Sequence, residues 1–145
     1  MTRAKLSCIP GVFGLLFSLL LYGCARLPDV RGVYRGQNTE TDSGCVDPSN
    51  NQTGGTTPFT VNVTSQTGAD FSGTAQSGFP STLGLKGQVT ANGGVSGTLT
   101  GANGTFAFQA TFDGTLTGNT MTANYTGRFT AGETCAMEGR FTVTR

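Results

Sequence analysis

The sequence predicts an all-β protein, a small eight-stranded antiparallel up-and-down barrel, with a β-sandwich as the alternative. From residue 30 onward a five-residue phrase recurs, with an apolar residue at each end and glycine in the middle. Its clearest copies are VSGTL at 95–99 and FDGTL at 112–116. Because strand side chains alternate between two faces, the glycine and both apolar residues of each copy share one face. No segment after the leader has helical periodicity or helix caps.

The runs of alternating residues follow one another along the chain, separated by turn residues. Residues 59–64 (FTVNVT) alternate strictly, which is typical of a strand with one buried face. Asn92-Gly93 is a strong hairpin signal, because both residues accept positive φ. The run 105–117 is interpreted as one long strand, although Asp113-Gly114 would also suit a turn between two short ones. Strands are expected at residues 30–35, 59–64, 71–75, 83–89, 95–100, 105–117, 121–129 and 134–144.

The short connections favour closure of these strands into a barrel. Strands that are joined by short turns become neighbours in the sheet, and closure removes both free edges. Glycines in phase with the apolar residues fit a tightly coiled barrel, whose strands must bend. Several strands have only six or seven residues, fewer than the roughly 9–11 that cross a bilayer, so we expect the threonine-rich face to meet water.

The chain divides into an expected signal peptide (1–23), a tether (24–29) and a single domain (30–145). A length of 145 residues fits one domain. Nine basic and eight acidic residues are nearly balanced, and they stay so when Arg3 and Lys5 leave with the signal peptide. No field of one sign remains to hold nucleic acid, so we expect no nucleic-acid partner. The chain has no histidine, the commonest general base and metal ligand.

The first 23 residues have the pattern of a secretory signal peptide. Two basic residues, Arg3 and Lys5, precede a largely apolar run at 12–22. That run is too short to cross a membrane as a helix, which needs about 20 residues.

The end of the leader, Leu21-Tyr22-Gly23-Cys24, resembles the lipobox of bacterial lipoproteins. The resemblance implies cleavage before Cys24, a diacylglyceryl group on its sulfur, and a location in the bacterial cell envelope. Ala25 in the next position implies sorting to the outer membrane. The alternative is ordinary secretion with a free thiol at Cys24. With more than one acyl chain the anchor would be stable, and the tether would hold the domain close to the membrane.

Two cysteines remain in the domain, Cys45 and Cys135. In an exported protein an even remainder predicts one disulfide, here between positions near the start and the end of the domain. The alternative, a metal site, has no histidine and no paired-cysteine spacing to complete it.

Residues 36–58 form the longest stretch without a recognisable period, and it is rich in Asn, Thr, Ser, Asp and Gly. A loop of this length is usually functional or tied down, and Cys45 supplies a tie. Glu40, Asp42 and Asp47 are oxygen donors of the type that calcium prefers. They lack the spacing of a known calcium loop, so we expect no metal.

The order of elements resembles the lipocalin and avidin superfamily, including Gly32-Val33-Tyr34 where those families often have glycine, any residue and tryptophan. The resemblance implies a barrel whose interior can hold a small ligand. The large inward side chains would then line an apolar pocket, and in the alternative they simply fill the core. These candidate ligand-binding residues are Phe59, Phe71, Phe106, Phe108, Phe112, Tyr125, Phe129, Met137 and Phe141.

No constellation of catalytic residues is present, so we expect no enzyme and no cofactor. Lys86 and the charged residues of the later strands fall on the polar phase, where solvated side chains are the rule. The sequence therefore predicts a non-catalytic binding domain, a carrier or receptor for a small apolar ligand. The alternative is a protein-interaction or inhibitor module that uses residues 36–58 and the hairpin tips.

Overall fold

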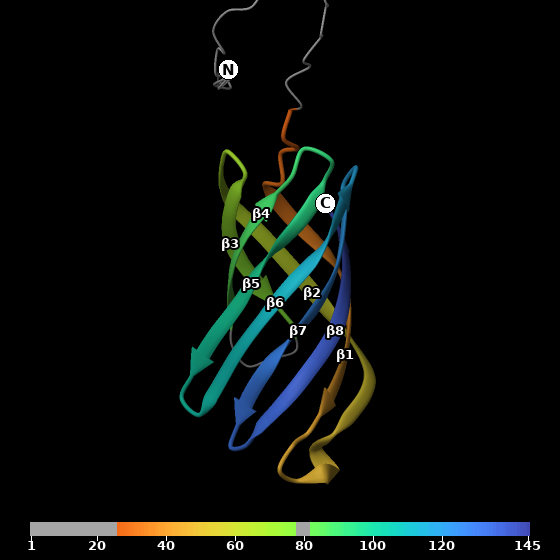
Figure 1. Ribbon diagram of the computed structural model, residues 1–145, viewed down its shortest axis with the longest axis vertical. Coiled ribbons are helices and arrows are strands. Elements are labelled where there is room, and N and C mark those ends of the chain that lie inside the picture. Colours follow the sequence, from red (N-terminus) through yellow and green to blue (C-terminus); the bar gives the residue numbers. More distant parts are fainter. Residues whose placement is uncertain (1–25, 78–81) are drawn as a thin grey trace, which may run out of the picture.

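The computed structural model describes residues 26–77 and 82–145; the predicted signal peptide and Cys24 lie outside this part of the chain. Its eight antiparallel strands close into a barrel in sequence order, with β8 hydrogen-bonded to β1 (Figure 1). The prediction of an up-and-down barrel is confirmed, and the β-sandwich alternative is wrong. The strands are β1 (Gly32–Ser43), β2 (Gln52–Thr67), β3 (Asp70–Gln76), β4 (Leu83–Val89), β5 (Gly94–Asn103), β6 (Phe106–Thr117), β7 (Thr120–Ala131) and β8 (Thr134–Thr144).

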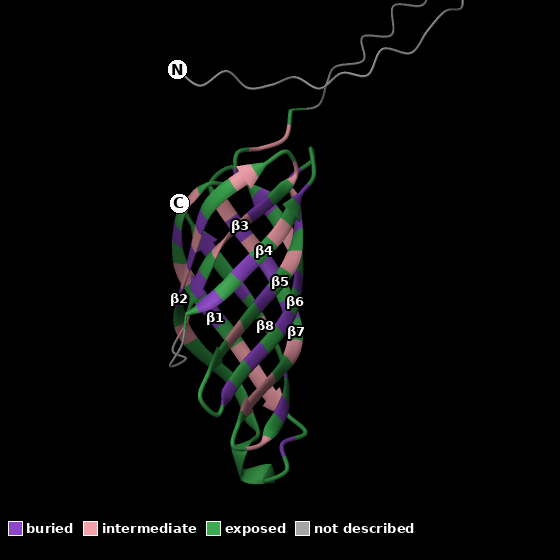
Figure 2. Cartoon of the chain, turned by 90° about the vertical axis from the view of Figure 1, so that its left-hand side faces the viewer, coloured by how far each residue is buried: buried purple, intermediate pink, exposed green. Residues whose placement is uncertain are grey.

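The inward positions carry the apolar residues and the outward positions carry Thr, Ser and charged residues. Buried and exposed residues alternate along each strand of the closed part (Figure 2). Among the described residues, the large apolar side chains that remain exposed are Val33 and Val46. Over the same residues, no helix has the length and hydropathy needed to span a membrane.

The glycines of the repeated phrase lie where neighbouring strands approach too closely for a side chain. A Cβ atom on Gly73 would lie 1.9 Å from the carbonyl oxygen of Asn62, and one on Gly97 would lie 2.1 Å from that of Lys86. At other copies an aromatic side chain lies over the glycine. Tyr125 of β7 pairs with Gly139 of β8, and a Cβ atom on Gly139 would lie 2.4 Å from the Tyr125 hydroxyl oxygen. The phrase therefore lets the strands bend and leaves room for the rings.

The expectation of an irregular stretch at 36–58 is wrong. β1 continues to Ser43 and β2 begins at Gln52, so the connection is 44–51, which includes the 3-10 helix η1 (Pro48–Asn50). The two strands stay paired from Gly32 to Asp42, with a bulge between Glu40 and Asp42. This hairpin extends farther from the barrel than the other hairpins at the same end (Figures 1 and 2). Its inward positions are polar, which hides the period of two.

The barrel wall is uneven in height. β3 and β4 have seven residues each, whereas β2 has 16 and β6 has 12. The alternative turn at Asp113-Gly114 is wrong, because β6 pairs with β7 without interruption from Phe106 to Thr117.

Candidate functional site

The predicted ligand-binding residues all point into the barrel. Eight of them are buried, with exposed fractions of 7% or less, and Phe129 is half-buried and packs against the same core. These residues are Phe59, Phe71, Phe106, Phe108, Phe112, Tyr125, Phe129, Met137 and Phe141. Their position is as predicted, while their role toward a ligand stays a prediction.

Phe141 of β8 lies at the centre of an aromatic cluster. Its ring centroid is 5.1 Å from that of Phe59, 6.1 Å from that of Phe112 and 6.5 Å from that of Tyr125. Centroids at these separations belong to rings in contact. At this height the interior is therefore occupied by side chains from β2, β6, β7 and β8.

A polar cluster lies beside these rings on the second half of β1, toward its end at Ser43. The Tyr125 hydroxyl is 2.8 Å from the Asn38 Oδ1 atom and also contacts the Glu40 Oε2 atom. Asn38 is 2% exposed, and burial raises the pKa of Glu40. Burial and the contact with Glu40 raise the pKa of Tyr125 as well. A phenol has one hydrogen, so both contacts are satisfied when Glu40 is protonated, donates to Tyr125, and Tyr125 donates to Asn38.

Asp42 continues the inward row of β1 toward the barrel end. Its Oδ1 atom is buried and has no hydrogen-bond partner within the part of the chain that the structure describes. Partial burial raises the pKa of this carboxyl. Asn38, Glu40 and Asp42 were missed as interior residues. Continuing the period of two from Tyr34 through Gly36 would have found them.

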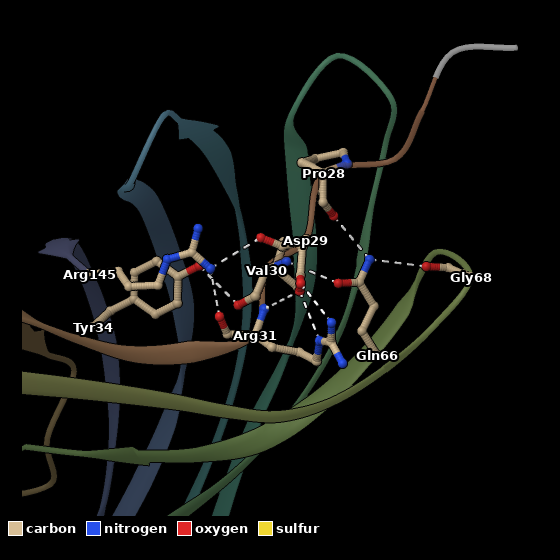
Figure 3. Close-up of polar contacts among 8 residues, drawn as sticks. All are labelled: Pro28, Asp29, Val30, Arg31, Tyr34, Gln66, Gly68 and Arg145. Carbon is tan, nitrogen blue, oxygen red and sulfur yellow. Dashed lines mark hydrogen bonds and ion pairs between the residues drawn. The ribbon is translucent and has the colours of Figure 1, made fainter. Parts of the chain in front are cut away.

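At the opposite end of the barrel, the segment before β1 is fastened onto the rim (Figure 3). Val30 is fully buried, and its backbone N–H donates to the Gln66 Oε1 atom at 2.9 Å. The Gln66 Nε2 atom donates to the carbonyl oxygens of Pro28 at 3.0 Å and Gly68 at 3.1 Å. The Tyr34 hydroxyl donates to the Val30 carbonyl at 2.9 Å. Part of the predicted tether therefore belongs to the folded domain.

Arg145 at the end of the chain completes this fastening. Its Nη1 atom donates to the carbonyl oxygens of Arg31 at 2.6 Å and Asp29 at 3.3 Å (Figure 3). The guanidinium carbon lies 5.5 Å from the centroid of the Tyr34 ring, a cation–π arrangement. We call residues 28–31 with Tyr34, Gln66 and Arg145 the N-terminal latch.

The connection between β1 and β2 is tied to β8 by the predicted disulfide, Cys45–Cys135. The loop between β7 and β8 adds a second tie. The Asp47 backbone N–H donates to the Glu133 Oε2 atom at 2.7 Å, and the Asn50 side-chain amide donates to Oε1. These hydrogen bonds lower the pKa of Glu133. We call residues 44–51 the distal loop.

The distal loop presents Val46, whose side chain is 84% exposed, the larger of the two exposed fractions of large apolar residues in the described chain. Val46 stands between the disulfide at Cys45 and the hydrogen-bonded Asp47. A loop that is held in this way loses little conformational entropy when it binds a partner.

The grooves found on the barrel open on its outer, polar wall. One crosses β2 to β5 and includes Ser72, Lys86 and Ser96; another crosses β1, β7 and β8. Lys86 is exposed, as the sequence predicted. Within residues 26–77 and 82–145, no three His, Cys, Asp or Glu side chains lie close enough together to hold a metal ion.

The chain was compared with protein-family models, with curated proteins and with solved structures, and none of them matches.

Proposed function

We propose that the protein is a lipid-anchored protein of the bacterial envelope whose barrel is a non-catalytic binding domain that contacts a protein partner through the distal loop. The observation that carries this proposal is Val46, a large apolar side chain that is 84% exposed on a loop fixed by a disulfide. A loop that is already ordered loses little conformational entropy on binding, so a fixed loop with an exposed apolar side chain suits contact with a protein partner. The proposed anchor is Cys24, which lies outside the described residues.

Crosslinking in living cells would test the distal loop directly. A photoreactive amino acid at position 46 should give a discrete protein adduct. The matched control is position 33, because Val33 is the other exposed large apolar residue of the described chain and lies on β1 near the N-terminal latch. Equal adducts at both positions, or none at 46, would count against the proposal.

The lipid anchor has a separate test. We expect Cys24→Ser to move the protein from the membrane fraction to the soluble fraction, because the acyl chains would be lost. Unchanged partitioning of this variant would contradict lipidation and leave the barrel's binding role to be judged by the crosslinks.

A carrier of a small apolar ligand is the second candidate function. The observation that favours it is the buried Asp42 Oδ1 atom, which has no hydrogen-bond partner in the described chain and belongs to a residue paired with the buried Met137 of β8. Ligand pockets combine apolar walls with a few polar groups of this kind. Native mass spectrometry of protein extracted from membranes should then show a bound molecule, which Asp42→Asn would weaken. Absence of any bound molecule, together with no binding of an apolar fluorescent probe, would refute the carrier.

A further inference from the structure

The N-terminal latch shortens the free part of the tether. Pro28 is already held by Gln66, and Asp29 and Arg31 are held by Arg145. Between Cys24 and Pro28 only residues 25–27 intervene, and four residue steps span at most about 14 Å. A lipid on Cys24 would therefore hold the latch end of the barrel within a short distance of the bilayer surface.

The latch end also has tips that suit close approach to lipid headgroups. The hairpin turns at this end are 68–69, 90–93 and 118–119, and their residues are small and uncharged. Of the charged side chains beside them, Asp29 and Arg31 already neutralise each other in an ion pair of 2.7 Å. Two further charged side chains at this end, Asp70 beside the 68–69 turn and Arg145 of the latch, carry opposite signs, so little net charge opposes contact with a zwitterionic surface.

We propose that the latch end of the barrel rests on phospholipid headgroups and that the distal loop is held on the side away from the membrane. This orientation rests on the proposed lipidation of Cys24. The latch shortens the free tether and fixes the point where the chain leaves the barrel, which is the rim at the start of β1 (Figure 1). A partner that binds at Val46 would then approach from the aqueous side and not from the membrane.

The chain contains no tryptophan, so one introduced tryptophan is a unique fluorescent reporter. Ala91 and Thr105 are exposed hairpin residues at the two ends of β5, and they offer a matched pair. Full-length lipidated Ala91→Trp and Thr105→Trp would be reconstituted into phosphatidylcholine vesicles with and without lipids that carry a nitroxide spin label on the headgroup. We expect the spin label to quench Ala91→Trp and to leave Thr105→Trp unchanged, because the ten-residue strand between the two turns is about 30 Å long and places them at opposite ends of the barrel.

Flotation of the same vesicles separates the two levels of the proposal. Protein that does not float with the vesicles contradicts the lipid anchor and the orientation together. Protein that floats but shows equal quenching at both tryptophans, or stronger quenching at 105, overturns the orientation alone.

The latch itself is tested by Gln66→Ala, with Gln109→Ala on the outer face of β6 as the control. We expect Gln66→Ala to reduce the difference in quenching while flotation stays complete. If the difference in quenching between positions 91 and 105 were as large in Gln66→Ala as in Gln109→Ala, the role of the latch would be overturned.

Discussion

The two ends of the barrel differ in how their polar and apolar groups are satisfied. At the latch end Val30 is fully buried. Its N–H and the carbonyl groups of residues 28–31 meet Gln66, Tyr34 or Arg145, and the Arg31 N–H donates to Asp29. At the distal end Val46 is 84% exposed, and a carboxylate oxygen of Asp42 is buried without a partner in the described chain. Packing and hydrogen bonds close the latch end around Val30, whereas the distal end leaves one large apolar side chain in water and one buried acidic oxygen unpaired within the described residues. This difference is why we place binding at the distal end.

Removal of the disulfide should have the largest effect and should act mainly on the distal end. The bonded cysteines are 90 residues apart, and the chain-entropy model gives about 4–5 kcal/mol for a loop of that size. We expect Cys45→Ser with Cys135→Ser to lower the free energy of unfolding in urea by up to that amount. Amide exchange should accelerate more at residues 44–51, which the disulfide ties directly to β8, than at Val30. Equal acceleration at both ends would remove the contrast between them.

A matched pair of valines sharpens the comparison further. Val30→Ala removes methyl groups from a fully buried site, and we expect it to lower the free energy of unfolding by about 2 kcal/mol. Val46→Ala should change that free energy by less than about 0.5 kcal/mol, because the side chain is already in water. Val46→Ala should instead weaken crosslinking of the distal loop from a photoreactive amino acid at the exposed position Ser49. If both variants lost similar free energy of unfolding, the Val46 side chain would be packed against the protein and not exposed to water.

These two ends also mark where sequence reasoning succeeds and where it stops. β4 and β8 were predicted at Leu83–Val89 and Thr134–Thr144, the bounds observed, because apolar residues occupy every second position. The disulfide followed from the even number of cysteines in the domain. The second half of β1 was missed because its inward residues are polar, so no apolar period exists to be recognised.

The latch could not be predicted for a different reason. Gln66 lies 36 residues from Val30, and Arg145 lies 114 residues from Arg31. Both contacts join a side chain to backbone groups, which leave no pattern of residue types. Only closure of the barrel brings β2, β8 and the entering chain to the same rim.

The polar cluster at Glu40 predicts a pH dependence with an unusual sign. Burial raises the pKa of Glu40 above its ordinary 4.5, so the folded chain binds this proton more tightly than the unfolded chain. The stabilisation is therefore full below pH 4.5 and is lost as the pH rises through the folded pKa. The pKa of Asp42 is raised in the same way and adds to the trend. The titratable group that faces Glu40 from another strand is Tyr125 of β7, among the described residues.

Urea unfolding between pH 4.5 and 8 would measure this dependence. Glu40→Gln should flatten it, because the amide does not titrate. The control is Glu138→Gln, an exposed carboxylate on the outer face of β8. A wild-type protein whose stability rises over this range, or a Glu40→Gln variant with the same slope, would contradict a protonated Glu40.

The smallest effect is expected at the Asp29–Arg31 pair of the latch end, and its sign is opposite. A bidentate contact with the Arg31 guanidinium, at 2.9 and 2.7 Å, lowers the pKa of Asp29 to about 2. The stabilisation is present above the ordinary pKa of 3.8 and is lost as the pH falls toward 2. Both side chains are more than half exposed, so water screens the pair, and Arg31→Gln should barely move the urea midpoint at pH 7. Carbon-13 NMR should show the Asp29 titration in Arg31→Gln returning toward 3.8, while Glu40 keeps its raised value. If Glu40 shifted as well, the two ends would be coupled, and the contrast between a closed latch end and an independent distal end would fail.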